Sequence, residues 1–484
     1  MSKAPAPGAL KPPLHVKLFY SFGEIAQSGG FSTALGFVFF YYTAVLGLSG
    51  GLVGAAMAIS LGFDAVFDPL IGSWSDNISS RLGRRLPLMI AATPLMCVAL
   101  ILLFSPPAHL AQPALFGWLT ITSIAIRGVI SMFNVPYIAL GAEMADGYAE
   151  RSRVVAWRTV AGIASGVLIT ALAYMLFFTK PLGLLRAEAY PGFGRLVALL
   201  IFVGATICCI GVARYAGRLP RAATVAASIW RRLPAELAEI FRNPSFRILF
   251  FSGVISFVAV GANGTLDNHV RMFVWKLAPW MMQALGYIYL ASMLAGVALA
   301  PLLVRRLEKR TTVMVGLSLV LIALTVLPLL RASGLYAPTG LAAMAPVGVT
   351  SVITGLGAGF IAIAFPSMMA DAADEHEVLF GARREGLYFA GFGFAGKAAS
   401  GVGALIGGVA LDVLKFPHDA GHAGAAMSPA TLDGLILAWG PLPAVLIAIG
   451  MVMSWRYGIN RRRHDLITAE LKARHRAVEP APAE

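Results

Sequence analysis

The sequence predicts an all-α membrane protein with twelve transmembrane helices in two six-helix bundles. First, 58% of the 484 residues are hydrophobic, 13% are charged and the mean hydropathy is +0.76, outside the range of soluble domains. Second, roughly a dozen apolar runs, each long enough to span a bilayer, alternate with short polar breaks. Third, the longest polar interval, 217–245, follows the sixth run. Because only helices satisfy backbone hydrogen bonds within such runs, each run is expected to be helical.

The expected helices follow the apolar runs in order, each ended by charges, prolines or glycines. The first bundle, 18–216, contains the runs 18–46, 51–73, 86–106, 112–141, 155–179 and 194–216. The second bundle, 246–457, contains the runs 246–272, 280–304, 311–331, 337–367, 386–412 and 431–457. A cytoplasmic N-terminal tail (1–17), a central cytoplasmic loop (217–245) and a cytoplasmic C-terminal tail (458–484) complete the expected organisation.

The 38 Lys and Arg residues lie mostly in alternate polar breaks and at both chain ends. By the positive-inside rule both termini are therefore cytoplasmic, and the protein is expected to be a multi-pass protein of the cell (inner) membrane. This distribution explains the net charge of +14 without a nucleic-acid partner. The cysteines, Cys97, Cys208 and Cys209, lie in apolar runs, so neither a disulfide framework nor a structural metal site is expected.

Two aspartates, Asp64 and Asp68, interrupt the apolar run 51–73 in the stretch GFDAVFDPLIG. At positions i and i+4 they share one face of a helix. Each costs at least about 2.5 kcal/mol near the bilayer centre, and two on one face repel unless one is protonated or both share a cation. The pair therefore predicts a binding site for H⁺ or Na⁺. The alternative is a structural ion pair with Arg127 or Lys397.

The run 112–141 carries a stripe of residues at i, i+4, i+7 and i+11, which is expected to face the bundle interior. The residues are Arg127, Ser131, Asn134 and Ile138. Arg127 is expected either to neutralise the aspartate pair or to receive an anionic group of a substrate. Pro136 removes a helix hydrogen bond and bends the run, as is common beside transporter sites.

Lys397 lies in the glycine-rich stretch GFGFAGKAASGVGALIGG, where another helix can approach closely. A buried ammonium requires a partner. Lys397 is expected to bind substrate or to close a charge network with Asp64 and Asp68, and snorkelling to an interface is the third alternative.

Charged residues at the cytoplasmic breaks predict salt bridges that form in one access state and break in the other. Ordinary solvated loops are the alternative. The gate residues so predicted are Asp76, Arg81, Arg84, Arg85, Glu143, Asp371, Asp374, Arg383 and Arg384.

Two six-helix bundles joined by a cytoplasmic loop is the architecture of the major facilitator superfamily. Six stretches resemble the glycoside-pentoside-hexuronide:cation symporters in order and spacing, and they cover nearly the whole chain: FFYYTAVLGLSGGLVG, DAVFDPLIGSWSD, NVPYIAL, ERSRVVAWRTVAG, MMADAADEHE and FAGKAASGVG. The resemblance implies that Asp64 and Asp68 bind the coupling cation. It also implies that Lys397 lies beside the cation and sugar sites and that Arg158 is the arginine of the fifth helix.

The chain departs from the melibiose permease, the best-known member of that family, where that protein holds sugar and sodium. Ser28 and Asn134 stand in place of two sugar-binding acids, and Ile138 replaces a tryptophan that lines the sugar site. Phe67 and Ser131 replace two neutral sodium ligands. The lost acids weaken the case for the same galactoside, and the lost sodium ligand favours H⁺ over Na⁺.

We therefore expect a symporter that moves a sugar or glycoside with H⁺ or Na⁺ by alternating access. The cation site would comprise Asp64, Asp68 and Ser131, and the substrate site Ser28, Arg127, Asn134, Ile138, Arg158 and Lys397. Animal sodium-dependent lysophosphatidylcholine symporters share LGRRLP, VPYIAL and KAASGV, so a lysophospholipid or other amphiphile is the alternative substrate. No enzymatic activity or cofactor is expected. The other expected partners are membrane lipids, and a monomer is expected to function.

Overall fold

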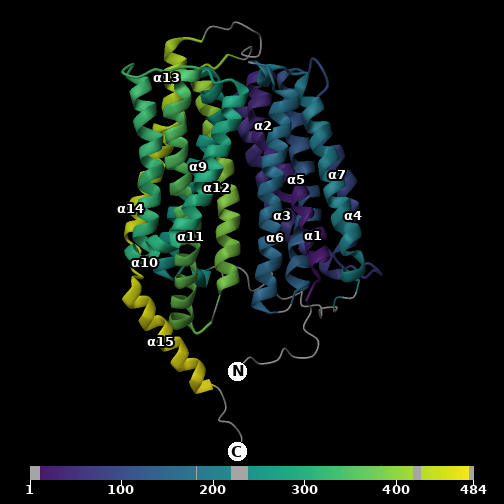
Figure 1. Cartoon of the computed structure of the whole chain (residues 1–484), viewed down its shortest axis with the longest axis vertical. Helices are drawn as coiled ribbons and strands as arrows, with labels where there is room; N and C mark the ends of the chain where they lie inside the picture. The colour runs from purple at the N-terminus through teal and green to yellow at the C-terminus, as the bar shows by residue number, and fades with distance from the viewer. Residues whose placement is uncertain are drawn as a thin grey trace, which may run out of the picture. The chain divides into compact units, whose positions relative to one another are not determined.

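The computed structural model describes residues 11–478 except 146, 181, 218, 220–237, 383 and 418–426, and the regular elements among them are helices (Figure 1). The chain falls into two compact units. The first comprises Met1–Ala226, Ala278–Gln283 and Leu411–Ala426, and the second comprises Ala227–Leu277, Ala284–Ala410 and Met427–Glu484. The six-helix boundaries and the cytoplasmic location of the termini stay predictions.

The first unit contains seven α-helices in its described residues. They are α1 (Leu14–Ser21), α2 (Gly30–Phe40), α3 (Gly50–Asn77), α4 (Leu86–Phe104), α5 (Gln112–Glu143), α6 (Tyr148–Leu172) and α7 (Ala189–Ala216). Short π-helical segments, η1 (Ile25–Gly29), η2 (Tyr41–Val45) and η3 (Ala173–Phe177), extend α2 and α6, and a 3₁₀ turn, η4 (Gly183–Leu185), precedes α7.

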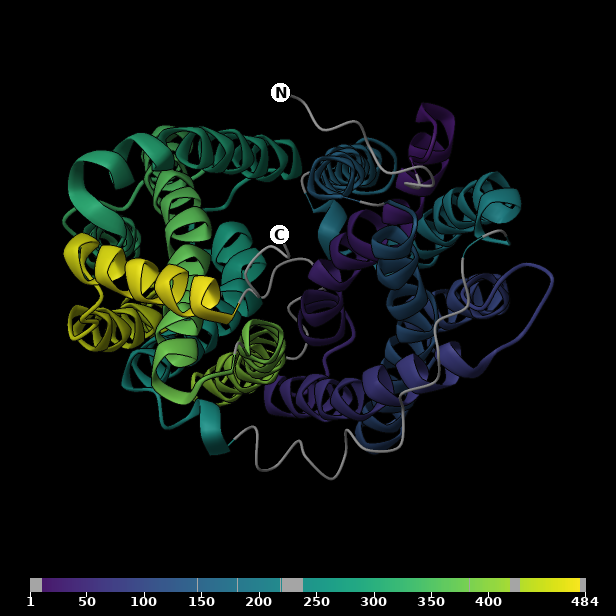
Figure 2. The same ribbon diagram turned by 90° about the horizontal axis from the view of Figure 1, so that it is seen from below.

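The second unit is built mainly from α9 (Pro244–His269), π-helical η5 (Val270–Val274), α10 (Pro279–Ala332), α11 (Leu341–Phe380), α12 (Glu385–Val413), α13 (Pro429–Trp439), α14 (Pro441–Trp455) and α15 (Arg461–Val478). The first residues of α10 and the last residues of α12 belong to the first unit. Viewed from below, α15 lies across the end of the second unit, where it packs against α11 (Figure 2).

Ten helices in the described part of the chain are long and apolar enough to cross a membrane. The expected runs 280–304 and 311–331 form one element, α10, whose helical course is interrupted at Glu308 with φ of 67°. The expected run 18–46 is divided among α1, η1, α2 and η2, so no single long helix represents it. The run 431–457 is divided at Gly440 because the next residue, Pro441, begins a new helix.

The expected end of the run 337–367 was too early. The structure continues α11 to Phe380, so Asp371 and Asp374 lie on a helix instead of in a cytoplasmic break. The helix ends at Gly381, whose φ of 76° lies in the left-handed region that glycine adopts without strain. The following gate residue predicted from the sequence, Arg383, lies outside the described residues.

The start of α9 shows how the sequence fixes a helix boundary. The Asn243 Oδ1 accepts hydrogen bonds from the backbone N–H groups of Ser245 (2.8 Å) and Phe246 (3.2 Å). Pro244 follows at the first helical position, where its missing N–H costs nothing. The Asn243 Nδ2 donates to the carbonyl of Ala372 at 2.9 Å, which ties α9 to α11.

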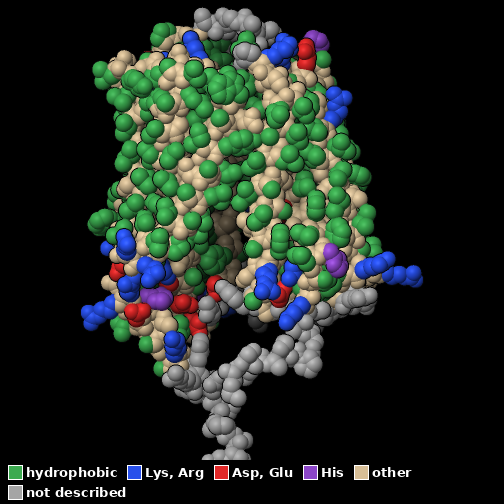
Figure 3. Space-filling view, in the orientation of Figure 1, with side chains coloured by type: hydrophobic (Ala, Val, Ile, Leu, Met, Phe, Trp, Pro, Cys, Tyr) green, Lys and Arg blue, Asp and Glu red, His purple; other side chains and the backbone are tan. Residues whose placement is uncertain are grey.

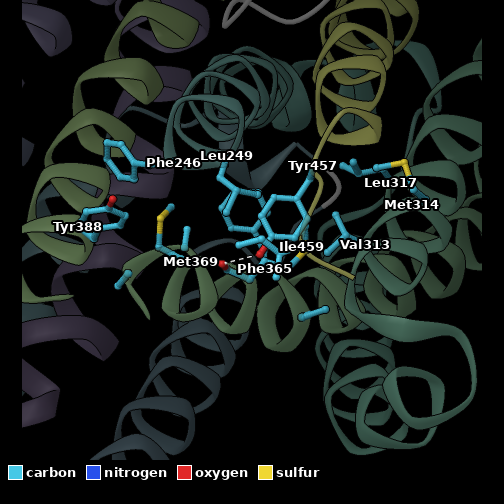
Figure 4. Close-up of a cluster of buried hydrophobic side chains, with 14 of the residues drawn as sticks. Phe246, Leu249, Val313, Met314, Leu317, Phe365, Met369, Tyr388, Tyr457 and Ile459 are labelled. Atoms are coloured by element: carbon cyan, nitrogen blue, oxygen red, sulfur yellow. Dashed lines mark hydrogen bonds between the residues drawn. The ribbon is translucent and has the colours of Figure 1, made fainter. Parts of the chain in front are cut away.

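Apolar side chains of the second unit gather in a buried cluster (Figure 4). The labelled members come from α9 (Phe246 and Leu249), α10 (Val313, Met314 and Leu317), α11 (Phe365 and Met369), α12 (Tyr388) and the segment after α14 (Tyr457 and Ile459). The Tyr457 hydroxyl donates to the carbonyl of Met368 at 3.0 Å. Burial raises the pKa of Tyr457 far above its usual value, so its phenol remains a neutral donor.

Hydrophobic side chains cover the sides of the helices, whereas most charged side chains lie near the helix ends (Figure 3). This distribution matches a bilayer, whose core excludes charges and whose headgroups receive them.

Candidate cation and substrate site

The two aspartates predicted to bind a cation lie on one face of α3. Ser60, Asp64 and Asp68 stand at i, i+4 and i+8, and α3 packs along α5, which carries Arg127 and Ser131 one turn apart. Asp64 is buried, with 6% of its surface exposed, whereas Asp68 is half-buried. All five side chains thus converge at one α3–α5 contact in the first unit.

The Ser131 hydroxyl lies between the two carboxylates. Its Oγ is 3.1 Å from Asp64 Oδ1 and 2.6 Å from Asp68 Oδ1. A serine hydroxyl carries one hydrogen and can donate only one of these hydrogen bonds at a time. The second contact is satisfied if the other carboxyl carries a proton and donates to Oγ. Without that proton, the same three oxygens are neighbouring acceptors that suit a cation.

Arg127 reaches the same cluster from α5. Its Nη1 is 3.7 Å from Asp64 Oδ2, and its Nε donates to the Ser60 hydroxyl at 2.9 Å. Ser60 is buried and in turn donates to the carbonyl of Met57 at 2.8 Å. Sequence reasoning missed Ser60, although its position four residues before Asp64 was a signal. Arg127 therefore contacts one acid of the pair and is held in place by Ser60.

Asn134 and Ile138 continue the α5 stripe, one and two turns beyond Ser131. The Asn134 Oδ1 is buried and has no hydrogen-bond partner among the described residues. Ile138 is 44% exposed. A buried polar atom without a partner costs about 1–3 kcal/mol, so Asn134 is suited to a ligand that supplies a donor.

Arg158 forms an ion pair that sequence reasoning missed. Its Nε lies 3.1 Å from Glu24 Oε1, and the Glu24 side chain is only 6% exposed. Beside Glu24, the rings of Tyr20 and Tyr137 stack at 4.5 Å, and each hydroxyl donates to the other residue's backbone carbonyl. Glu24, the acid in the stretch FGEIAQSGG, was the sequence feature that could have indicated this pair. Arg158 is therefore positioned by a buried carboxylate.

Two further predicted substrate residues are Ser28 and Lys397. Ser28 lies in η1, and its side chain is outside the described residues. Lys397 is an exposed residue of α12 in the second unit. Their roles in substrate binding stay predictions.

Four of the five gate residues predicted in the first unit form one connected group. Arg85 contacts Asp76 and Glu143, each at 2.7 Å, and Arg84 contacts Glu143 at 2.8 Å. Arg81 is exposed in the turn after α3. The group ties the end of α3 to the end of α5.

Two gate residues predicted in the second unit, Asp371 and Arg384, lie in separate ion pairs. Asp371 accepts from Lys309 at 2.7 Å, and Arg384 lies 3.9 Å from Glu239. Asp374 is half-buried on α11. The partners Lys309 and Glu239 were not predicted from the sequence, because they come from segments distant in the chain.

Comparison with known proteins gives a match to the family described as MFS/sugar transport protein over residues 19–461. The isoprimeverose transporter of Lactiplantibacillus pentosus is 23% identical over 465 residues, which cover 96% of this chain and 92% of that protein. The putative sulfoquinovose importer of Salmonella typhimurium is 24% identical, covering 97% of this chain and 94% of that protein. The glucuronide carrier protein homolog of Escherichia coli is 23% identical, covering 95% and 96%.

Solved structures share the fold. A bacterial homolog of the human lysosomal transporter Spinster, in an inward-facing and unoccupied conformation, matches with a TM-score of 0.62 and 12% identity over 97% of this chain and 98% of that chain. The nucleoside transporter NupG matches with a TM-score of 0.57 and 18% identity over 92% and 100%. At these identities the likeness concerns the fold alone.

Proposed function

The chain belongs to the MFS/sugar transport protein family, and from this premise we propose that it carries a sugar or glycoside together with one H⁺ bound at Asp64, Asp68 and Ser131. The protein is a multi-pass inner-membrane transporter of the major facilitator superfamily and not an enzyme. Its relatives over nearly the whole chain include carriers named for isoprimeverose, sulfoquinovose and glucuronide. Alternating access in such a fold couples the movement of ion and substrate.

The single Ser131 hydroxyl shared by two carboxylates carries the proposal. In the loaded state Asp68 is protonated and donates to Ser131 Oγ, across the shorter of the two contacts. Ser131 then donates to Asp64, which stays ionised beside Arg127. Each donor has one acceptor in this arrangement, and only one negative charge remains, balanced by Arg127.

Release of the proton leaves two carboxylates on one helix face beside the Arg127 guanidinium. This state is less favourable in a membrane unless another cation or a change of access compensates it. Binding or release of the cation at the cluster therefore changes the free energy of the protein, as symport requires. Na⁺ is the alternative ion, and the gradient experiment below separates the two.

The proposed substrate site uses polar groups of the first unit on α5 and α6. The Asn134 Oδ1, buried without a partner among the described residues, would accept a hydrogen bond from a sugar hydroxyl. Arg158, held by Glu24, offers further donors to ring oxygens or an acidic substituent. Ser28 and Lys397 remain proposed contacts on the basis of the family resemblance.

Uptake into proteoliposomes tests the function. A labelled panel of glycosides, uronides and lysophospholipids is offered under an inward H⁺ gradient and, separately, under an inward Na⁺ gradient. We expect a sugar to accumulate under the H⁺ gradient. Accumulation of lysophospholipid alone would overturn the sugar proposal, and accumulation under the Na⁺ gradient alone would overturn H⁺ as the ion. The functional unit is proposed to be a monomer.

The Ser131→Ala variant is expected to weaken the coupling ion's apparent affinity by about tenfold or more, because one hydrogen bond to a charged group is worth about 1.5–3 kcal/mol. The measurement is initial uptake as a function of external pH at saturating sugar. The matched control is Ser165→Ala, since Ser165 is also buried but donates only within its own helix. Equal pH dependence in Ser131→Ala and wild type would remove Ser131 from the ion site.

The Glu24→Gln variant is expected to raise the substrate KM about tenfold with a smaller change in kcat, because Arg158 loses the carboxylate that orients it. Sugar uptake kinetics at fixed pH measure this split. Glu150→Gln is the control, because Glu150 also pairs with a cation, Lys17, but away from the proposed site. An unchanged KM in Glu24→Gln, with folded protein, would contradict the positioning role.

A further inference from the structure

At the end of the second unit that carries α15, several basic side chains are exposed and two acids are buried. Asp371 and Glu375 are buried and paired with Lys309 and Arg463, and His464 lies 3.4 Å from Asp371. These two acids are thus occupied by partners within the protein.

Five arginines remain on the outer surface of this end: Arg305 and Arg306 before the turn of α10, Arg456 after α14, and Arg461 and Arg462 at the start of α15. All five are exposed, and none forms an ion pair among the described residues. Figure 3 shows Lys and Arg side chains gathered at this end of the unit. Two exposed acids of α15 accompany them: Asp465 lies 3.6 Å from His464, and Glu470 pairs with Arg474.

Hydrogen bonds hold the segments that carry these arginines together. The Arg461 Nη2 donates to the carbonyl of Arg305 at 2.9 Å, which joins α15 to the end of the first part of α10. The Arg310 Nη1 donates to the carbonyls of Trp455 and Tyr457, each at 3.3 Å. Tyr457 is anchored in the buried cluster of Figure 4. The patch is therefore a fixed surface and not a set of independent chain ends.

Apolar side chains place this patch at the depth of lipid headgroups. Trp455 is the last residue of a candidate span and is 66% exposed, and the Arg310 Cζ lies over its ring, 5.8 Å from the ring centroid. Val452 and Leu302, one turn further into their helices, are 63% and 53% exposed. Tryptophan beside arginine at the end of a spanning helix is typical of the membrane–water interface.

We propose that Arg305, Arg306, Arg456, Arg461 and Arg462, with Trp455, form a binding site for an anionic phospholipid of the adjacent leaflet. Guanidinium groups bind phosphate through paired hydrogen bonds, and the exposed Trp455, Val452 and Leu302 contact the acyl chains. Each unpaired arginine near an anionic membrane surface raises the affinity for anionic lipid about fivefold.

Arg456 and Arg462 are the residues to substitute in the test. Neither side chain makes a hydrogen bond or ion pair among the described residues, so their substitution removes no such bond. The full chain is purified and titrated with phosphatidylglycerol or phosphatidylcholine, and bound lipid is counted by native mass spectrometry. For Arg456→Gln/Arg462→Gln we expect about 25-fold weaker phosphatidylglycerol binding, with phosphatidylcholine unchanged. The single variant Arg462→Gln is expected to lose about fivefold and serves if the double variant does not fold.

The matched control is Arg81→Gln/Arg214→Gln, which removes two exposed arginines from helix ends of the first unit. It makes the same change in charge and is expected to bind phosphatidylglycerol as wild type does. Equal weakening in both double variants would show attraction by net charge alone and overturn the proposed site. Equal binding of the two lipids by wild type would overturn it as well.

Discussion

An Asp68→Asn variant is expected to bring sugar to equal concentrations on both sides of the membrane and no further. In wild type, one proton moving inward across 100 mV contributes about 2.3 kcal/mol, which sustains about a 50-fold sugar gradient. The amide resembles the protonated acid in shape but cannot release a proton, so the ion gradient no longer acts on the carrier. Uptake and exchange of labelled sugar in the same proteoliposomes measure the two activities.

Exchange of internal for external sugar is expected to persist in Asp68→Asn, because it does not require the proton to be released. The control is Asp433→Asn, an acid of α13 that pairs with Arg331 at 3.3 Å, and it should accumulate sugar normally. Accumulation by Asp68→Asn at the wild-type level would show that Asp68 does not carry the coupling ion.

An Arg127→Gln variant is expected to lose about 3–5 kcal/mol of stability, the usual cost of removing one partner of a buried ion pair. The cost arises because Asp64, 6% exposed, keeps its charge without the guanidinium 3.7 Å away. Thermal unfolding of the purified protein in detergent, compared with wild type, measures the loss.

The double variant Asp64→Asn/Arg127→Gln separates charge from packing. With both charges removed, most of the lost stability is expected to return, whereas accumulation of sugar stays absent. Arg84→Gln is a useful control, because its partner Glu143 keeps a second arginine, Arg85, and a smaller loss is expected. If the double variant is no more stable than Arg127→Gln, the structural role assigned to the pair is wrong.

Much of the candidate site could be predicted from helix periodicity. The spacing of Asp64 and Asp68 placed both acids on one helix face, and the α5 stripe placed Arg127 and Ser131 together. The structure brings these four side chains within contact because α3 and α5 pack lengthwise. Acids inside a long apolar run are costly, so their presence was itself informative.

The parts that could not be predicted depend on pairing between distant segments. Glu24 stands near the start of an apolar run, where an acid can be solvated, and only the packing of η1 against α6 buries it beside Arg158. Serines within helices commonly bond the backbone of their own helix, so the sequence alone does not single out Ser60. The C-terminal end of α11 was predicted too early because its last turns are acidic. In the structure, Asp371 in these turns pairs with Lys309 of α10.

The most direct test of the central claim is the movement of protons that accompanies sugar. Membrane vesicles containing the protein are suspended in a lightly buffered medium, the sugar identified by the uptake panel is added, and external pH is recorded. The account predicts a sugar-dependent rise of external pH in wild type, with one proton entering per sugar, and none in Asp68→Asn. Sugar entry without any change of pH, or an equal rise in Asp68→Asn, would contradict it.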